Sequence, residues 1–579
     1  MASVNDIEAQ VDELVADQSM NSTASVNDDT KSAYFKVKET MKLYNKFFLE
    51  AVKEETIRCA TNAKKSVSKE SRAFSENKKR SIRRPDLKAT SKMIEMNAVL
   101  YRKKQCGHLP GIDVGYQFYS RAAMAALGFH SQCFSGIDYI GKSSKEYKEY
   151  KSSLAVAVVL SGCYEDDQDN KEEIIYTGQG GNDNLGNKRQ VKHQELAGGN
   201  LALKNNCEEF DGVFPVRVVR GHKIDGKKVY TYDGLYKVDR WWKESGLSRF
   251  DVYKFRLRRI TGQPPLTTNQ VHFIKRRALH LSSTNKRTVC EDISGGQENL
   301  RIRVINEVDD TPAPTGFKYT VSNQIGEDVE LPSSASGCKC IGTCTDHKTC
   351  ACARLNYGSD FPYVVQEGHG RLLGAMDVVY ECGANCGCGP ECQNRVSQGG
   401  IKYQLEMFRT PDKGWGVRTL DLIPPGAPVC EYTGLLRKTA ELEKVIANDY
   451  LMEVDCLQTM LGMGGRQKRR GNVSFRNPFI KAKDIDKDPE FTIDAGSTGN
   501  VSRFINHSCD PNLFVQCILS DFHDPRLARV FLVASDYIPP LQELSYDYNY
   551  ALNSVRGPNN KIKRLPCHCG AADCRKRLY

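Results

Sequence analysis

Nine cysteines in two closely spaced groups are the residues of this chain best suited to metal chemistry. The first group lies in GCKCIGTCTDHKTCAC at 337–352, and the second lies at 382–392. Their thiols could pair as disulfides, bind metal or act as nucleophiles. The nine are Cys338, Cys340, Cys344, Cys350, Cys352, Cys382, Cys386, Cys388 and Cys392.

The rest of the chain favours metal over disulfides. The stretch MASVNDIEAQVDELVADQ is acidic rather than signal-like, and the longest apolar run, LAVAVVL at 154–160, is far shorter than the ~20 residues of a membrane helix. We therefore expect a nuclear or cytosolic protein without a membrane segment. Disulfides rarely persist in those reducing compartments, so a metal cluster is the better hypothesis.

The number of thiols suggests a stoichiometry. If three of the nine thiolates each bridge two metals, six single and three double contributions supply the twelve ligand positions of three tetrahedral zincs. Two zincs with one unused cysteine remain an alternative. Four nearby cations could offset part of the negative charge, namely Lys339, Lys348, Arg354 and Arg395.

The elements that position these thiols must belong to several domains. At ~150 residues per domain, 579 residues predict three or four units, and 40% hydrophobic with 26% charged residues is typical of globular proteins. The net charge of +11 is uneven, because residues 1–30 carry seven acidic groups and no Lys or Arg. We expect that segment to be disordered. The basic run SENKKRSIRRPDLK (75–88) could contact phosphates, serve as a nuclear address, or be a solvated tail.

Two helices are predicted before residue 106. Apolar residues at three- and four-residue steps predict an amphipathic helix over 34–57, and a second helix is expected after Pro85. The first would bury Val37, Met41, Tyr44, Phe48, Ala51 and Val52. The second would carry Leu87, Ile94, Ala98 and Tyr101 on one face.

From 107 to 265 the pattern changes to short strands separated by glycine turns, which predicts a compact β-barrel or sandwich. A poorly patterned connecting region, 266–335, precedes the cysteines. A mixed region with short β runs occupies 401–549, and within it 462–490 is polar and basic, which indicates a surface insertion.

Four motifs in order resemble the SET domain, the lysine methyltransferase fold that uses S-adenosylmethionine. They are KGWGVR (413–418), CEYTG (430–434), GNVSRFINHSCDPN (499–512) and ELSYDY (543–548). The nine-cysteine segment is similar to the pre-SET cluster of this fold, and CHCGAADC (567–574) is similar to its post-SET zinc loop. That loop offers three ligands, and the resemblance implies a zinc site completed by a fourth cysteine: Cys509, Cys567, Cys569 and Cys574.

The resemblance also implies an active site. The segment with Asn506 and His507 would pass under another loop as a pseudoknot. The cofactor would contact Lys413, Gly414, Trp415, Tyr450, Arg503, Asn506 and His507. Methyl transfer from a sulfonium needs a neutral lysine that is aligned and shielded from water. A channel lined by Tyr432, Tyr546 and Tyr548 would provide this, with Tyr548 as the catalytic tyrosine.

The residue at 546 bears on the methyl count. Many relatives carry phenylalanine where this chain has Tyr546. The extra hydroxyl takes space and can hold a water, so we expect mono- and dimethylation.

The region 107–265 resembles the SRA domain, which reads methylated cytosine in DNA by flipping the base out of the duplex. Seven stretches match in order: LPGIDVG (109–115), GIDYIG (136–141), GCYEDDQDN (162–170), YTGQGGND (176–183), GNKR (186–189), PVRVVRG (215–221) and YTYDGLYKV (230–238). The resemblance implies that Tyr164 and Tyr176 sandwich the base, unless they are ordinary strand aromatics. Further contacts would come from Asp167, Thr177, Asn187 and Arg189.

The chain is thus expected to be a multidomain α+β protein, mainly β. Its parts would be a disordered acidic segment (1–33), a helical segment (34–106), a barrel-like SRA domain (107–265), a connecting region (266–335), a pre-SET three-zinc cluster (336–396), a SET domain (397–549) and a post-SET loop (563–579).

This order of domains resembles the plant Su(var)-related histone methyltransferases. The resemblance implies a nuclear chromatin enzyme that uses S-adenosylmethionine and four zincs. It would methylate lysine 9 of histone H3 in nucleosomes with methylated DNA, coupling DNA methylation to silencing. Two alternatives are a methyl-DNA-binding adaptor with an inactive SET domain and a purely DNA-binding protein with structural zinc.

Overall fold

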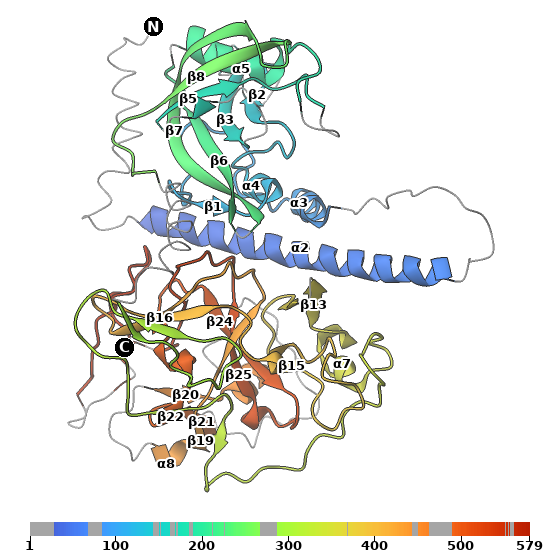
Figure 1. Ribbon diagram of the computed structural model, residues 1–579, viewed down its shortest axis with the longest axis vertical. Helices are drawn as coiled ribbons and strands as arrows, with labels where there is room; N and C mark the ends of the chain where they lie inside the picture. Colours follow the sequence, from blue (N-terminus) through green and yellow to red (C-terminus); the bar gives the residue numbers. More distant parts are fainter. Residues whose placement is uncertain are drawn as a thin grey trace. The chain divides into compact units, whose positions relative to one another are not determined.

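The computed structural model divides into two compact units, Met1–Ser283 and Thr284–Tyr579, each with its own core (Figure 1). It describes residues 28–67, 84–142, 147, 150, 152–161, 168–169, 172–183, 189–210, 212–224, 226–266, 287–366, 369–442, 450–461, 489–550, 552–553, 555 and 561–579. Outside them lie several predicted features: the acidic residues 1–27, the basic residues 75–83, the insertion residues 462–488, and Tyr164, Asp167 and Asn187.

The helix predicted over 34–57 is confirmed as part of a longer one. Helix α2 spans Asp28–Val67, and Val37, Met41 and Tyr44 are buried in the core of the first unit. Tyr44 also shares a 3.1 Å hydrogen bond with Ser120, the N-cap of α4 (Arg121–Leu127). One stripe of α2 therefore supplies core residues, as the spacing predicted.

The second helix is confirmed, and Leu87, Ala98 and Tyr101 pack against the core as predicted, but the placement of Ile94 on that face is wrong. Helix α3 spans Pro85–Glu95, its buried residues are Ala89, Thr90 and Met93, and Ile94 is 62% exposed. The helix stops before Ala98 because Asn97 adopts the left-handed conformation, with φ of 60°. The Thr90 hydroxyl donates to Ala122 O at 3.0 Å, so α4 selects the buried face.

The first unit is built around a mixed sheet of eight strands. Its order is β2-β3-β6-β7-β8-β5-β4, with β1 paired to β7, and β3 and β6 are parallel. The bounds are β1 Gln117–Phe118, β2 Ile137–Ile140, β3 Leu154–Leu160, β4 Gln168–Asp169, β5 Glu173–Thr177, α5 Gly198–Glu208, β6 Val216–Ile224, β7 Lys227–Ser245 and β8 Asp251–Arg259. Every residue of β3, the apolar run LAVAVVL, is buried. The predicted β-rich region is confirmed.

A buried arginine ties the segment before the sheet to the sheet itself. Arg217 on β6 is 1% exposed and donates to Gln105 O at 2.7 Å and Gly107 O at 2.8 Å. Burying a guanidinium is costly unless it is hydrogen-bonded, so these bonds from its terminal nitrogen hold residues 105–107 against the sheet.

The second unit contains several small sheets. Their orders are β17-β16-β10-β9, β12-β19-β21-β20, β15-β24-β25-β18, β11-β22, β13-β14 and β23-β26. The bounds are β9 Thr288–Cys290, β10 Arg303–Ile305, β11 Lys318–Tyr319, β12 Gln324–Ile325, α7 Ala351–Leu355, β13 Tyr363–Gln366, β14 His369–Leu372, β15 Val379–Tyr380, β16 Leu405–Arg409, β17 Trp415–Thr419, β18 Pro428–Tyr432, β19 Leu435–Lys438, α8 Thr439–Leu442, β20 Leu451–Glu453, α9 Cys456–Leu461, β21 Phe491–Asp494, β22 Thr498–Gly499, β23 Asn506–His507, β24 Leu513–Leu519, β25 Arg529–Ala534 and β26 Ser545–Tyr546.

Residues 287–325, expected to be a connecting region, contribute strands to these sheets. Strand β10 runs parallel to β16, β11 runs parallel to β22, and β12 runs parallel to β19. The sequence shows little periodicity here because strands of two or three residues are too short to display one.

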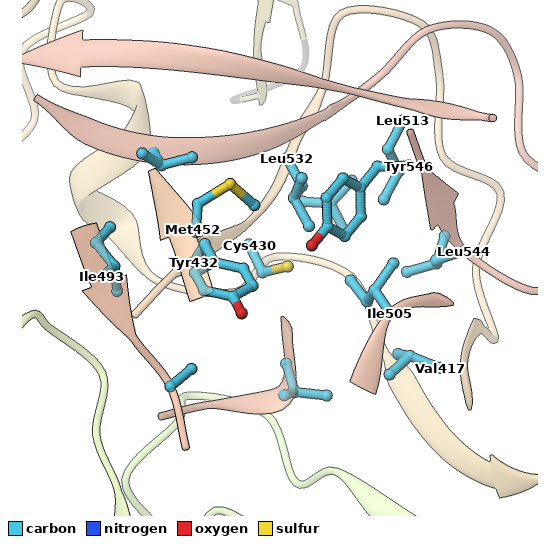
Figure 2. Close-up of a cluster of buried hydrophobic side chains, with 14 of the residues drawn as sticks. Val417, Cys430, Tyr432, Met452, Ile493, Ile505, Leu513, Leu532, Leu544 and Tyr546 are labelled. Atoms are coloured by element: carbon cyan, nitrogen blue, oxygen red, sulfur yellow. The ribbon is translucent and has the colours of Figure 1, made fainter. Parts of the chain in front are cut away.

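The main core of the second unit surrounds two of the predicted channel tyrosines. Figure 2 shows Tyr432 and Tyr546 among Cys430, Met452 and Ile505 in this core. Tyr432 is 3% exposed and Tyr546 is 6% exposed. Among the helices within the described ranges, none combines the length and apolar character needed to cross a bilayer.

Candidate active site and metal centres

Three cysteine sulfurs form a nearly equilateral triangle at the centre of the nine-cysteine cluster. The Sγ distances are 3.7 Å for Cys338–Cys344, 3.9 Å for Cys338–Cys382 and 3.8 Å for Cys344–Cys382. Sulfurs that share a tetrahedral zinc at a Zn–S distance of about 2.3 Å lie about 3.8 Å apart. The triangle therefore has the spacing that one zinc along each edge requires.

The other six cysteines pair off along the edges. Cys352 and Cys386 group with Cys338 and Cys382, whereas Cys340 and Cys350 group with Cys338 and Cys344. Cys388 groups with the triangle itself. Cys392 is buried in the same cluster, and the three-zinc hypothesis would place it on the third edge with Cys388. In that arrangement all nine sulfurs would be used, and Cys338, Cys344 and Cys382 would be the bridging ligands.

Backbone and side-chain N–H groups point at several of these sulfurs. Cys338 N donates to Cys386 Sγ at 3.2 Å, Asn394 Nδ2 donates to Cys382 Sγ at 3.5 Å, and Arg395 donates to Cys388 Sγ at 3.8 Å. Such donors stabilise thiolates. Arg395 is one of the four cations predicted to offset the cluster's charge.

The predicted post-SET ligands also come together. The Sγ atoms of Cys509, Cys567, Cys569 and Cys574 lie within 4.8 Å of one another. The Cys509–Cys567 distance is 3.9 Å, and Arg575 N donates to Cys509 Sγ at 3.4 Å. Four thiols at this spacing fit one tetrahedral zinc.

A two-residue parallel pairing brings the distant active-site motifs together. In β23 and β26, Asn506 pairs with Ser545 and His507 pairs with Tyr546. Tyr548 N donates to His507 Nδ1 at 3.2 Å, so the neutral imidazole carries its proton on Nε2. That nitrogen lies 3.5 Å from Cys509 Sγ. His507 therefore connects the backbone of Tyr548 to a candidate zinc ligand.

The predicted channel tyrosines form an aromatic group. The ring centroids of Tyr546 and Tyr548 are 4.8 Å apart, and those of Tyr548 and Tyr550 are 6.3 Å apart. The Tyr548 hydroxyl donates to Ile505 O, and the Tyr432 hydroxyl donates to Tyr450 O, both at 3.0 Å. Burial raises the pKa of Tyr432 and Tyr548, so both hydroxyls stay protonated.

The predicted cofactor loop is a tight hairpin between β16 and β17. Thr410 N donates to Gly414 O at 2.8 Å, and Gly414 has a left-handed φ of 72°, which a residue with a side chain adopts poorly. Asn506 Nδ2 donates to Trp415 O at 3.1 Å, so the loop and the β23 segment are directly linked.

Arg503 is surrounded by rings. Its guanidinium carbon lies 4.0 Å from the ring centroid of Tyr450, 4.5 Å from that of Phe317 and 4.9 Å from that of Phe504. Desolvation lowers its pKa, although arginine remains charged in proteins. Its Nε is buried without a hydrogen-bond partner among the described residues, which leaves one donor for a ligand.

Sequence reasoning missed Glu543. Its carboxylate accepts from Lys413 Nζ at 2.5 Å and from Asn506 Nδ2 at 3.0 Å, so it joins two predicted cofactor-binding segments. The signal was available, because Glu543 is the first residue of the ELSYDY motif.

In the first unit, two of the predicted DNA-binding residues are deeply buried. Tyr176 on β5 is 1% exposed and belongs to a hydrophobic core cluster. Thr177 is fully buried and accepts from Lys254 Nζ at 3.1 Å. Arg189 is exposed. Tyr176 and Thr177, which are neighbours on β5, are therefore core residues of the sheet.

The fold and this site together define the class of protein to which the chain belongs. A SET fold with a tyrosine-lined core, a linked cofactor loop and flanking cysteine clusters is that of a lysine methyltransferase. Residues 105–263 match the SAD/SRA domain, residues 294–395 the Pre-SET motif and residues 414–549 the SET domain.

The chain is similar to characterised plant proteins. "Histone-lysine N-methyltransferase, H3 lysine-9 specific SUVH4" of Arabidopsis thaliana is 54% identical over 506 residues, which cover 86% of this chain and 80% of that protein. SUVH6, of the same description and organism, is 42% identical, and the match covers 82% of this chain and 58% of that protein.

Solved structures agree over nearly the whole chain. One is the crystal structure of KRYPTONITE in complex with mCHH DNA, H3(1-15) peptide and SAH. It has a TM-score of 0.77 at 48% identity, and the match covers 94% of this chain and 100% of that chain. The structure of Arabidopsis thaliana SUVH6 with SAM has a TM-score of 0.68 at 36% identity, covering 95% of this chain and 100% of that chain. The chain belongs to the SUVH family of histone-lysine N-methyltransferases, in which SRA, pre-SET and SET domains are joined.

The sulfur geometry leads to a prediction about metal content. We expect about four zincs in the folded chain, three in the nine-cysteine cluster and one at Cys509 with the post-SET cysteines. Cys569→Ser should remove one zinc, whereas Cys344→Ser, at a bridging position, should remove more than one. Elemental analysis of the purified protein measures this.

Cys290→Ser provides the control, because this thiol on β9 lies outside both clusters and its loss should leave the zinc content unchanged. A wild-type protein with two zincs or fewer would contradict the three-edge arrangement.

Proposed function

We propose that this chain transfers one or two methyl groups from S-adenosylmethionine to lysine 9 of histone H3. The observation that carries this proposal is the junction of β23 and β26, which joins the cofactor segment at Asn506 and His507 to the tyrosines at 546 and 548. The close relation to proteins described as H3 lysine-9 specific supports the choice of substrate.

The roles of the pocket residues follow from their chemistry. The cofactor supplies a methyl group on a sulfonium, which is the electrophile of an in-line displacement. Lys413 and the free Nε of Arg503 offer donors for its polar groups, and Trp415 and Tyr450 offer ring surfaces. Asn506 would contribute through its backbone and side-chain oxygen, because its amide N–H groups bind Trp415 O and Glu543. His507 and Gly414 complete this proposed pocket through the backbone.

The tyrosines prepare the lysine amine. A new N–C bond forms as the S–C bond breaks, so the amine must first lose a proton to solvent and then point along the axis of the breaking bond. Tyr432, Tyr546 and Tyr548 would surround it with ring surface and exclude water. The Tyr548 hydroxyl is held in place by Ile505 O, so it can orient the amine.

We propose a supporting role for the metals. The cluster region has few apolar core residues besides its cysteines, namely Ala353 and Phe361 with Ala351 partly buried, so zinc would hold it folded. The fourth zinc, at Cys509, would fix the post-SET segment beside His507 and the active site.

The SRA region would direct the enzyme to DNA with methylated cytosine. Tyr164 and Tyr176 would stack on the flipped base, Asp167 and Thr177 would hydrogen-bond it, and Asn187 with Arg189 would contact the DNA. Binding through this domain raises the local concentration of nucleosomal histone tails without new contacts in the active site. The protein would act in the nucleus, on chromatin.

The first test concerns Tyr548. We expect Tyr548→Phe to lower kcat on an H3 peptide by about 100-fold or more, because a misaligned amine reacts poorly. Methyl transfer from labelled S-adenosylmethionine measures this, and Tyr403→Phe, a hydroxyl lost elsewhere in the same core, should retain activity. A zinc-loaded wild type with no transfer to any histone would instead favour a methyl-DNA-binding adaptor with an inactive SET domain.

The second test concerns the methyl count. Tyr546→Phe removes the hydroxyl that restricts the channel, so we expect the trimethylated fraction to rise by at least about tenfold. Mass spectrometry of an H3 peptide carried to completion distinguishes the products. No increase in trimethylation would remove Tyr546 from this role, and Tyr403→Phe again serves as the control.

The third test separates reading from catalysis. Tyr164→Ala should weaken binding to a duplex with methylated cytosine by about 5- to 150-fold, the loss of one base–aromatic stack, while peptide methylation stays near the wild-type rate. Fluorescence anisotropy with methylated and unmethylated duplexes measures the first quantity. Equal binding of both duplexes by the wild type would exclude methylcytosine as the ligand.

A further inference from the structure

The segment 306–319, which we call the strap, contacts the candidate cofactor pocket at two separate places. It follows β10 and ends in β11. Its sequence, NEVDDTPAPTGFKY, contains none of the residues assigned to the pocket. Each contact consists of a strap residue, an arginine and an aromatic residue of the pocket.

The first contact begins at Asp309. Its Oδ2 accepts from Arg409 Nε at 2.9 Å, and the Arg409 guanidinium carbon lies 5.7 Å from the ring centroid of Trp415. Arg409 and Trp415 are also direct partners across the β16–β17 hairpin. The Arg409 side chain is 23% exposed and the Asp309 side chain is 39% exposed, so this is a surface ion pair that water partly screens.

The second contact begins at Phe317. Its ring lies 4.5 Å from the guanidinium carbon of Arg503, on which Tyr450 packs at 4.0 Å. Phe317 also meets Phe504 in a T-shaped contact with the ring centroids 5.6 Å apart. A guanidinium between rings is held by cation–π attraction, which restricts its orientation.

Internal hydrogen bonds order the start of the strap, and strand pairing anchors its end. Asn306 Nδ2 donates to Asp309 Oδ1 at 2.8 Å, and Thr311 N donates to the same oxygen at 3.0 Å, so the carboxylate has a fixed orientation. These hydrogen bonds keep the pKa of Asp309 well below its usual range, so it is ionised at neutral pH. At the other end, β11 pairs with β22, and Lys318 N donates to Ser497 O at 2.8 Å.

We infer that Asp309 and Phe317 are positioning residues for S-adenosylmethionine binding, which act through Arg409 and Arg503. By holding the two arginines against Trp415 and Tyr450, they preform the pocket and reduce the ordering that binding must otherwise impose. This inference rests on the proposed function, because Trp415, Tyr450 and Arg503 are cofactor residues only under that proposal. The strap thereby becomes part of the catalytic domain's cofactor site.

The test measures cofactor affinity directly and by kinetics. We expect Asp309→Asn to raise the KM for S-adenosylmethionine about fivefold and Phe317→Leu about tenfold, with the peptide KM and kcat within twofold of the wild type. Asp310→Asn removes the same charge from the exposed neighbour and should change nothing. Phe317→Tyr keeps the ring, so its KM for S-adenosylmethionine should equal that of the wild type.

Trp415 reports binding without catalysis. The chain has three tryptophans, Trp241, Trp242 and Trp415, and the first two lie in the first unit, so a Trp241→Phe, Trp242→Phe background of the full chain leaves one fluorophore at the pocket. Titration with S-adenosylhomocysteine should show an affinity loss of about fivefold for Asp309→Asn and of about tenfold for Phe317→Leu.

The outcomes separate the two proposals. If the background protein binds S-adenosylhomocysteine and both strap variants bind it equally well, the positioning role is overturned and the proposed function stands. A fall in kcat with an unchanged cofactor KM also overturns it, because that pattern indicates a structural or catalytic role. If the background protein does not bind at all, the proposed function fails and the inference fails with it.

Discussion

The pairing of Asn506–His507 with Ser545–Tyr546 is the constraint on which the catalytic unit depends. Two strands of two residues each bring the proposed cofactor segment, the tyrosines and a candidate zinc ligand into one place. Because successive residues of a strand point to opposite faces, the register of this pairing also decides where the tyrosines at 546 and 548 lie. A shift by one residue would move Tyr546 out of the core.

We expect metal to stabilise the cysteine region in the way that apolar packing stabilises the other cores. Eight of its nine cysteines are buried, yet few other buried apolar residues accompany them. Bringing the three thiolates of Cys338, Cys344 and Cys382 within 4 Å of one another without cations would be strongly unfavourable, since like charges at that distance repel in a low dielectric. The sulfur positions therefore fit a site that metal would organise. Arg395 and the N–H donors would supplement the metal's charge.

The sheet of the first unit is stabilised mainly by apolar packing. Its central strands are long and its inner residues apolar, and its buried charges are largely hydrogen-bonded, as for Arg217, or paired, as for Arg220 with Asp233. Tyr176 and Thr177 belong to that core, so a base-binding pocket there would use residues that also stabilise the sheet. Substituting such residues changes stability and binding together, whereas Tyr164 allows a test chosen from the sequence motif alone.

The order of domains and most of the site followed from the sequence, because glycine-rich turns, cysteine spacing and the RFINHSC and ELSYDY motifs are local patterns. The helix over 34–57 and the strands of the first unit were also predictable from periodicity. The buried face of α3 was not, since α4 selects Met93 rather than Ile94. Nor could spacing single out Cys338, Cys344 and Cys382 as the candidate bridging thiolates.

Glu543, Asp309 and Phe317 illustrate the same limit. Glu543 lies far along the chain from Lys413, and Asp309 lies far from Arg409, so no local pattern relates them. By itself, the sequence determined which chemical groups this protein carries and roughly which domain holds each. The tertiary structure decided which groups meet, because contacts between distant segments depend on strand pairing and packing that no short stretch of residues encodes.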